Sequence, residues 1–387
     1  MAALAMEGKP NKTLAFCLFK YFPYGGQQRD MLRIALACQS HGYEIDVYTT
    51  AWKGERPPSL RVHLYRPRAW SNHARVRQYQ AWVARQLAPH PSACVVGFQK
   101  MPGLDVYFAA DVCYEAKVRE EHGPLYRLLP RYRLYRAFEE AVFGPDSRTQ
   151  VLMLSQIQEQ SYVQHYGTAA DRIHRMPPNI PPDRLAGPEA LEVRRAFRRT
   201  LGLGEEDRLL LQLGSDFHRK GLDRSILALA SLPKDLLAQT RLYVVGDSSP
   251  RSFVRLAQRL GVAEHVIFLG PRDDVPRILA AADLLVHPAH QEAAGIVLLE
   301  ALACGLPAVV SGICGYAPYI AQAQAGWVLP EPFDQALFNR TVQAALERDD
   351  LAQIGHRGIE FARREDLYGM VDAAVEVIAA VARDAGT

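Results

Sequence analysis

Short apolar runs alternate along the chain with stretches in which apolar residues recur every three to four positions. In the first half, the pattern predicts a helix at residues 27–41 and strands at residues 13–19, 44–49, 93–98 and 151–155. Because helical stretches separate successive strands, the pattern indicates βαβ units around a parallel sheet.

The same alternation starts again in the second half. Residues 176–182 hold four prolines, which suits a stiff linker between two domains. Beyond the linker, the pattern predicts helices at residues 189–201, 223–232, 251–260, 275–282 and 293–304. It predicts strands at residues 209–213, 241–245, 266–269, 284–287 and 307–311. The expected fold class is therefore α/β, with two doubly wound Rossmann-like domains and a binding crevice between them.

Length and charge agree with two domains of different character. We expect a loose leader at residues 1–12, an N-terminal domain at residues 13–182 and a C-terminal domain at residues 183–365. Residues 1–185 hold 24 Lys and Arg against 16 Asp and Glu, a net charge of +8, whereas the remainder holds 21 against 26. Unless this asymmetry is chance scatter, the first half meets an anionic partner.

Other chemistry is constrained by the cysteines and by hydropathy. The six cysteines lie far apart without a C-x-x-C pair, so we expect no metal or disulfide scaffold and favour a reducing cytosol. No run approaches the roughly 18 apolar residues of a membrane-spanning helix, so any membrane contact is expected to be peripheral.

Residues 291–300, with the sequence QEAAGIVLLE, form the first candidate site. They follow an apolar strand and predict a helix whose first turn is Ala293-Ala294-Gly295. Small residues there leave the first backbone N–H groups open to an anion, which the helix dipole also attracts. On one helix, Glu292 and Glu300 would lie about 12 Å apart on nearly the same side, which suits a ligand with phosphates between two polar ends. A solvated helix face is the ordinary alternative, but residues 296–299 are apolar.

Two further loops follow predicted strands. Residues 214–221, GSDFHRKG, place Arg219 and Lys220 where paired cations can neutralise a departing diphosphate, although an ordinary basic loop would look the same. Residues 22–26, FPYGG, offer Gly25 and Gly26 for close approach of the backbone to a phosphate, a weak signal by itself. The three loops together indicate a nucleotide-sugar site.

These residues resemble those of glycosyltransferase family 4, whose members are retaining enzymes of the GT-B fold. The resemblance covers nearly the whole chain and includes four long strings: AFCLFKYFPYGGQQRD (15–30), KMPGLDVYFAADVCYEAK (100–117), LGSDFHRKG (213–221) and HQEAAGIVLLEA (290–301). It implies that the two domains face each other across a deep cleft, and that residues 366–387 pack back on the N-terminal domain.

The resemblance also implies a role for each matching residue. Glu292 would bind donor-sugar hydroxyls, with the backbone around Ala293, Ala294 and Gly295. Arg219 and Lys220 would hold the diphosphate, which Gly25 and Gly26 would approach. The remaining matches are Glu300 for the ribose, Asp30 and Arg184 near the donor, and Asp111 as an acid important for the reaction. Many family members have Gly-Phe-Gly after the first Glu, and the Ala293-Ala294-Gly295 of this chain puts the identity of the sugar in doubt.

The implied function is transfer of a hexose, glucose in the first instance, from a UDP-sugar to a heptose of the lipopolysaccharide inner core. The UDP-sugar would be a co-substrate, and neither a cofactor nor a metal is expected. An N-acetylhexosamine donor with the same fold and acceptor class is one alternative. A nucleotide-sugar epimerase or binding module is another.

Residues 124–143, PLYRLLPRYRLYRAFEEAVF, interleave basic and aromatic side chains. Arg127, Arg131, Arg133 and Arg136, joined by Lys117, suit an anionic membrane surface, where aromatic residues settle at the interface. A helix packed on its own domain is the alternative, and no motif supports nucleic-acid binding. The resemblance favours the membrane, because its acceptor is a phosphorylated lipid, and it implies a protein attached peripherally to the inner face of the bacterial inner membrane.

Overall fold

The chain forms two compact units. The computed structural model describes residues 12–23, 25–89 and 92–384. Residues 1–177 with 369–387 form unit 1, and residues 178–368 form unit 2. The sequence places these breaks after residues 182 and 365. Most of the expected leader, residues 1–11, lies outside the described residues, as does Tyr24 of the Gly-Gly loop.

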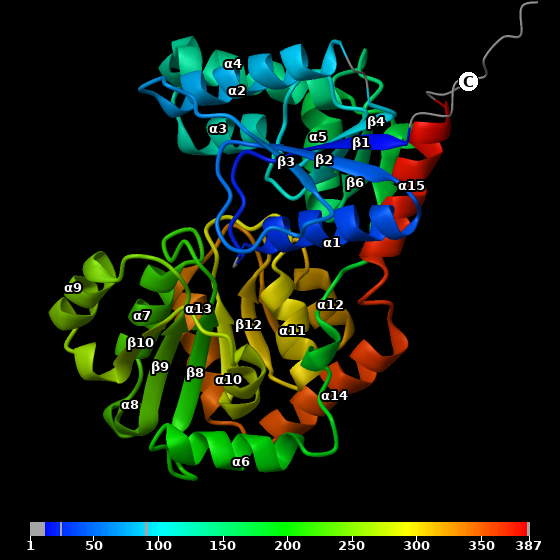
Figure 1. Cartoon of the computed structure of the whole chain (residues 1–387). Helices are drawn as coiled ribbons and strands as arrows, with labels where there is room; N and C mark the ends of the chain where they lie inside the picture. The colour runs from blue at the N-terminus through cyan, green and yellow to red at the C-terminus, as the bar shows by residue number, and fades with distance from the viewer. Residues whose placement is uncertain (1–11, 24, 90–91, 385–387) are drawn as a thin grey trace, which may run out of the picture. The chain divides into compact units, whose positions relative to one another are not determined.

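Unit 1 is a parallel sheet covered by helices (Figure 1). Its strands are β1 (Thr13–Cys17), β2 (Glu44–Thr49), β3 (Arg61–Leu64), β4 (Cys94–Gly97), β5 (Val106–Ala109), β6 (Gln150–Met153) and β7 (Ile173–Arg175). They lie in the order β3-β2-β1-β4-β5-β6-β7. Its helices are α1 (Gly26–Ser40), α2 (Asn72–Leu87), α3 (Tyr114–Glu121), α4 (Pro130–Phe143), α5 (Gln156–Tyr166) and α15 (Met370–Asp384), with short 3₁₀ turns η1 (Pro124–Leu128) and η2 (Ala170–Arg172).

The central strands β1, β4, β5 and β6 of unit 1 are mainly apolar because both faces of the sheet are covered there. In β1, Leu14 and Phe16 belong to one hydrophobic cluster, and Ala15 and Cys17 belong to another. Since successive side chains of a strand point to opposite faces, each cluster fills one side of the sheet. The C-terminal helix α15 joins the first cluster and packs on α1, although far from it in sequence.

Unit 2 has the same architecture. Its strands are β8 (Arg208–Leu213), β9 (Thr240–Val245), β10 (Val266–Gly270), β11 (Leu284–His287), β12 (Ala308–Ser311) and β13 (Gly326–Leu329), in the order β10-β9-β8-β11-β12-β13. Its longer helices are α6 (Ala190–Thr200), α7 (Leu222–Ala230), α9 (Arg251–Arg259), α11 (Ile296–Cys304), α13 (Gln335–Leu346) and α14 (Leu351–Arg364). Shorter ones are α8 (Lys234–Gln239), α10 (Val275–Ala281), α12 (Ala317–Gln322), η3 (Pro182–Arg184) and η4 (Ala263–His265). The expected fold class, doubly wound α/β twice over, is confirmed.

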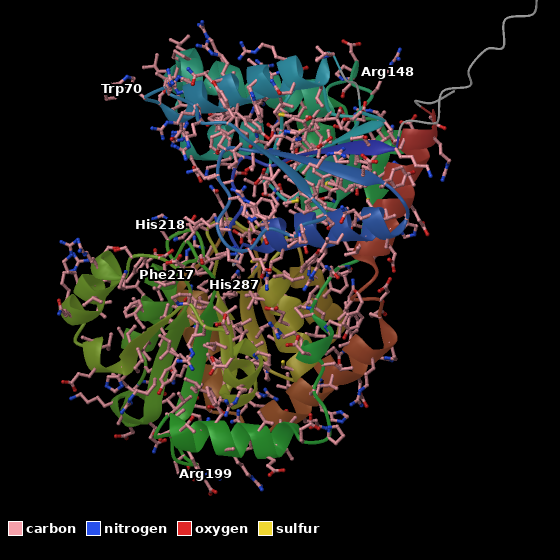
Figure 2. All side chains as sticks on the ribbon, in the orientation of Figure 1. Trp70, Arg148, Arg199, Phe217, His218 and His287 are labelled. Atoms are coloured by element: carbon pink, nitrogen blue, oxygen red, sulfur yellow. The ribbon has the colours of Figure 1, made fainter. Side chains whose placement is uncertain are left out.

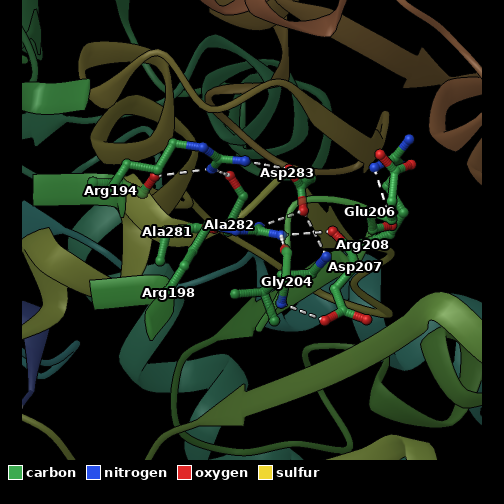
Figure 3. Close-up of polar contacts among 11 residues, drawn as sticks. Arg194, Arg198, Gly204, Glu206, Asp207, Arg208, Ala281, Ala282 and Asp283 are labelled. Carbon is green, nitrogen blue, oxygen red and sulfur yellow. Dashed lines mark hydrogen bonds and ion pairs between the residues drawn. The ribbon is translucent and has the colours of Figure 1, made fainter. Parts of the chain in front are cut away.

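A partly buried ion cluster holds α6 against the amino edge of this sheet (Figure 3). Asp283, just before β11, accepts hydrogen bonds from Arg194 and Arg198 of α6 and, at 2.6 Å, from the backbone N–H of Leu209 in β8. Arg198 also donates to the carbonyl oxygens of Gly204 and Asp207. Because these contacts lie at the amino ends of the strands, they stabilise the sheet at the edge where ligands of such folds do not bind.

Candidate donor-binding site

The sheet of unit 2 has a topological switch point between β8 and β11. These two strands are neighbours, and the chain proceeds outward from them in opposite directions, to β9 on one side and β12 on the other. Ligands of doubly wound sheets bind at the carboxyl ends of such strands. The loop at residues 214–221 follows β8 and the loop at residues 288–295 follows β11, so two of the three predicted segments meet there. Figure 2 shows His218 in the first loop and His287 at the end of β11, at the same edge of the sheet.

The two loops are fastened to each other through backbone contacts. The carbonyl oxygen of Arg219 accepts hydrogen bonds from the N–H groups of His290 and Gln291, at 2.9 and 3.3 Å. Gly221 has a φ of +73°, and a Cβ at this position would lie 1.9 Å from the carbonyl oxygen of Pro288. Only glycine allows this conformation together with so close an approach.

Three of the predicted residues meet at this junction. The Lys220 ammonium contacts the Glu292 carboxylate, and the Arg219 guanidinium lies 3.7 Å from the same carboxylate. Arg219 also donates to the carbonyl oxygen of Gln291 at 3.4 Å. Lys220 and Glu292 are nearly buried, whereas Arg219 is partly exposed. Arg219 also lies 3.4 Å from the exposed carboxylate of Asp216, so two cations and two carboxylates share the mouth of the switch point.

Burial changes the protonation equilibria here. Burial, and next the charge of Arg219, lower the pKa of Lys220 to about 7. The Glu292 carboxylate that contacts the ammonium acts in the opposite direction and favours the charged amine. Lys220 can therefore change its charge near neutral pH, and loss of the Glu292 contact would lower its pKa further.

His287 belongs to the site, although none of the sequence motifs includes it. Its Nε2 lies 3.3 Å from Glu292, its side chain is fully buried, and its Nδ1 has no hydrogen-bond partner in the described structure. Burial, then the charges of Lys220 and Arg219, lower the pKa of His287 well below its usual value, so the ring is neutral and can donate Nε2–H to Glu292. A histidine at the end of an otherwise apolar strand is the signal that could have identified it.

The predicted helix at residues 293–304 is wrong at its start. The helix α11 begins at Ile296, and Gly295 precedes it in a left-handed conformation with a φ of +92°. Glu292, Ala293 and Ala294 therefore lie in the loop, and Glu292 does not share a helix face with Glu300 as the spacing suggested. The loop turns Glu292 toward Lys220, while the first N–H groups of α11 still follow it directly.

Glu300 and Arg184 pair with each other. Glu300 is buried in α11, and the Arg184 Nε lies 3.2 Å from its carboxylate. Arg184 comes from η3 and also contacts Asp183 at 2.7 Å. The family resemblance implies that both residues contact the donor, but it does not predict that they pair with each other.

The other predicted residues belong to unit 1. Gly25 is the N-cap of α1 and Gly26 its first residue, and open space surrounds the position that a Cβ of Gly26 would take. Asp30 is half-buried one turn later, on the same side of α1 as Gly26. Asp111 is exposed just after β5, where Tyr107 donates a hydrogen bond of 3.3 Å to its carboxylate.

The loop that carries Asp111 is held by buried side chains. The backbone carbonyl oxygen of Asp111 accepts a hydrogen bond of 2.9 Å from the Tyr162 hydroxyl. The carbonyl oxygen of Val112 accepts one of 2.8 Å from the Lys100 ammonium. Glu139 of α4, which is fully buried, accepts from the first N–H groups of α3, those of Tyr114 and Glu115, at 2.8 and 3.0 Å. The same carboxylate also accepts hydrogen bonds from the Lys100 ammonium at 2.5 Å and from the Tyr166 hydroxyl at 2.6 Å.

The basic stretch at residues 124–143 is a 3₁₀ turn followed by a helix. Its arginines, Arg127, Arg131, Arg133 and Arg136, are all exposed, as are Leu125, Leu128 and Leu129. The opposite side of α4 is buried through Phe138, Glu139, Val142 and Phe143. Lys117 differs from the arginines, because it forms an ion pair of 3.9 Å with Glu121 one turn later in α3.

The described residues hold no group of three or more His, Cys, Asp or Glu side chains arranged to bind a metal ion. Among their helices, none combines the length and the apolar character that crossing a bilayer requires.

Comparison with known proteins agrees with the fold. The family description "Glycosyl transferases group 1" matches residues 193–361. The chain belongs to this family of glycosyltransferases. Lipopolysaccharide glucosyltransferase WaaG of Escherichia coli (strain K12) is 48% identical over 366 residues, which are 94% of this chain and 98% of that protein.

Solved structures give the same result. The crystal structure of WaaG, a glycosyltransferase involved in lipopolysaccharide biosynthesis, matches with a TM-score of 0.90 and 47% identity, covering 94% of this chain and 99% of that one. Anabaena Alr3699/HepE in complex with UDP-glucose matches with a TM-score of 0.71 over 95% of this chain and 99% of that one. At 19% identity, this second match supports the fold alone.

Proposed function

We propose that this glycosyltransferase moves glucose from UDP-glucose to a heptose of the lipopolysaccharide inner core, with retention of the anomeric configuration. The observation that carries the proposal is the contact of Glu292 with Lys220 and Arg219 at the β8–β11 switch point. The similarity of the whole chain to a lipopolysaccharide glucosyltransferase supports the donor sugar and the acceptor class.

When the donor binds, Lys220, Arg219 and Glu292 exchange their contacts with one another for contacts with the donor. The diphosphate takes Lys220 and Arg219 as counter-charges, and Glu292 then accepts hydrogen bonds from sugar hydroxyls. The neutral His287 keeps its Nε2–H on Glu292 and so fixes the orientation of the carboxylate. Glu300, held by Arg184, accepts hydrogen bonds from the ribose, while Ala293, Ala294 and Gly295 present backbone next to the sugar.

In the transfer, the bond between the anomeric carbon and the diphosphate oxygen breaks, and a bond to the acceptor oxygen forms on the same face. The acceptor proton passes to the departing phosphate oxygen. Negative charge grows on that oxygen, and Arg219, Lys220 and the first N–H groups of α11 stabilise it. These cations serve where other transferases use a metal ion, so the reaction needs neither a metal nor a cofactor.

The decisive assay offers UDP-glucose, UDP-galactose and UDP-N-acetylglucosamine with truncated-core lipopolysaccharide as acceptor, and assigns the linkage of the product. We expect α-linked glucose on heptose, and a Glu292→Gln variant at least about tenfold slower, because a charge-assisted hydrogen bond is lost. The exposed Glu264 of η4 provides the control variant Glu264→Gln, which removes the same charge away from the site. Preferred transfer of N-acetylglucosamine, or full activity of Glu292→Gln, would contradict the proposal.

The acceptor lies at an anionic bilayer surface, on the cytoplasmic side of the inner membrane, and α4 with η1 attaches the protein to it. The exposed leucines Leu125, Leu128 and Leu129 enter the interface while the arginines meet lipid phosphates. Each arginine adds about 1 kcal/mol near such a surface.

Vesicle co-sedimentation tests this attachment. Replacing Arg131, Arg133 and Arg136 with Gln should weaken binding to vesicles that contain phosphatidylglycerol. The matched control replaces Arg251, Arg255 and Arg259, exposed residues of α9 in unit 2, which changes the net charge equally. Equal loss in both triple variants would mean that only net charge matters.

A further inference from the structure

Unit 1 contains a cavity apart from the residues of the donor site. It has a volume of about 560 Å³ and lies between α3, η1 and α4. The charged residues that line it are Glu115 and Arg119 of α3, Arg127 of η1, and Arg133, Arg136 and Glu140 of α4; Tyr132 and Ala137 complete the lining. The volume lies within the range of cavities that bind small molecules, and it exceeds the size of a single inorganic anion.

One side of α4 is devoted to this cavity. Its lining positions 133, 136, 137 and 140 follow the spacing of neighbours along one helix face. Arg131 belongs to another face, where its guanidinium lies 5.8 Å from the centre of the Tyr135 ring. The cavity therefore contains a selected subset of the arginines in this basic stretch.

The charges of the lining are unbalanced. Glu115 accepts hydrogen bonds from Arg119 at 2.8 Å and from the Tyr132 hydroxyl at 2.7 Å, so one carboxylate and one arginine neutralise each other. Burial alone would raise the pKa of Glu115, but Tyr132, Arg119 and the charge of Arg136 together lower it, and this carboxylate stays ionised.

Three cations remain without such partners. Within the part of the chain that the structure describes, the side chains of Arg127, Arg133 and Arg136 make no hydrogen bond or ion pair. Counting four arginines against two glutamates, the lining carries a net charge of +2. Guanidinium groups that converge on one cavity suit a phosphate group, whose oxygens they can bind in pairs.

We propose that this cavity binds a phosphate group carried on a sugar of the acceptor, through Arg127, Arg133 and Arg136. The inference rests on the proposed function for its acceptor and adds to it a discrete recognition site. A phosphate of a membrane lipid has the same chemistry, so the experiment must separate these two sources. Binding in a cavity also differs from diffuse attraction to a surface, in which every exposed arginine of α4 contributes alike.

The test compares four single variants of the full chain in detergent: Arg133→Gln, Arg136→Gln, Arg131→Gln and Arg148→Gln. Arg148 is an exposed arginine of unit 1 away from α4, and it serves as the matched control (Figure 2). The acceptor is truncated-core lipopolysaccharide, used either phosphorylated or after enzymatic dephosphorylation of its sugars.

For the phosphorylated acceptor, we expect KM to rise about tenfold in Arg133→Gln and in Arg136→Gln with little change in kcat. Dephosphorylation should raise the KM of the unmodified protein by a similar factor and abolish the difference between variants. If instead these two variants selectively lose binding to phosphatidylglycerol vesicles and the acceptor's phosphate has no effect, the cavity binds a lipid phosphate. Equal effects of Arg131→Gln, Arg133→Gln and Arg136→Gln, or effects no larger than that of Arg148→Gln, overturn the proposal.

A direct titration separates this inference from the proposed function. Inorganic phosphate is added to each full-length variant and its binding followed by ³¹P line broadening. We expect weaker broadening for Arg133→Gln and Arg136→Gln than for Arg148→Gln. This difference remains measurable even if the chain transfers to another acceptor, and its absence would rule out the cavity site.

Discussion

Lys220 couples the charge of the donor site to pH. In the proposed mechanism a protonated Lys220 binds the donor diphosphate, so donor affinity should fall as pH rises through its pKa. Burial and Arg219 lower this pKa to about 7 in the unmodified protein, and Glu292→Gln removes a charge that favours the ammonium, so the pKa of Lys220 should be lower still in the variant. We therefore expect UDP binding by the unmodified protein to weaken as pH rises through about 7, and binding by the variant to weaken at lower pH. Calorimetric titration with UDP between pH 5 and 9 measures both curves.

Lys220→Arg provides the control, because a guanidinium keeps its charge throughout this range. Its UDP affinity should be nearly constant with pH, whether or not Glu292 is present. Parallel pH curves for all three proteins would show that another group titrates.

Glu139 is the buried charge on which the Asp111 loop depends. In Glu139→Gln the amide keeps one acceptor but leaves Lys100 without its counter-charge, and breaking a buried pair costs about 3–5 kcal/mol. We expect a loss of about 3 kcal/mol in the free energy of unfolding, measured in urea. The neighbouring Glu140 is exposed, so Glu140→Gln should change the free energy of unfolding by less than about 0.5 kcal/mol.

The sequence gives no indication of Glu139. It lies within a stretch of exposed arginines, and its partners Lys100 and Tyr166 come from distant parts of the chain. Motif residues such as Arg219, Lys220 and Glu292 could be predicted, because each follows a strand and the two loops meet at one edge of the sheet. The pairs Lys220–Glu292 and Arg184–Glu300 could not, because they depend on three-dimensional packing.

The loops after β8 and β11 approach so closely that Gly221 has no room for a side chain. In Gly221→Ala, a left-handed backbone and the contact with Pro288 act together. Gly261 has the same φ of +73° with open space around its Cβ position, so Gly261→Ala isolates the backbone term, about 1 kcal/mol. We expect Gly221→Ala to cost about 3 kcal/mol of unfolding free energy and to raise the donor KM, whereas Gly261→Ala leaves the donor KM unchanged. Equal losses would show that the loops can separate freely.

Apolar runs and helical spacing predicted most of the elements that build both sheets. The strand at residues 44–49 agrees in both bounds, because the buried Ile45 and Val47 alternate with the polar Glu44 and Asp46 in the period of a strand. The short strands β3, β5, β7 and β13 were missed. The strands β3, β7 and β13 pair with a neighbour on one side only, and several of their side chains are half-exposed or polar. The strand β5 is central and fully buried, but it is only four residues long. The start of α11 was misplaced because Ala293 and Ala294 favour a helix, while the left-handed Gly295 that ends the loop is not visible as such in the sequence.

Each unit has its own hydrophobic core, so a substitution that removes core volume from one unit should destabilise that unit and leave the other unchanged. The helix α15 contributes Met370, Ala374, Val375 and Ile378 to the core of unit 1, where α1 and β4 lie against it. Ile378 is fully buried, and Ile378→Ala should cost unit 1 about 3 kcal/mol. Because buried amides exchange through opening of their own cooperative unit, exchange should accelerate in β1 and β4 and stay unchanged in β8 and β11.

Hydrogen exchange with mass spectrometry distinguishes this response from a global one. Glu376 is exposed on the same helix, so Glu376→Ala changes α15 without removing core volume and should leave every strand protected. Acceleration in both units would mean that the chain opens as one cooperative body. Acceleration confined to α15 would mean that the sheet of unit 1 is stable without it. Selective loss of protection in β1 and β4 makes α15 a structural part of unit 1, because α15 shares a hydrophobic core with both strands and packs on α1 and β4.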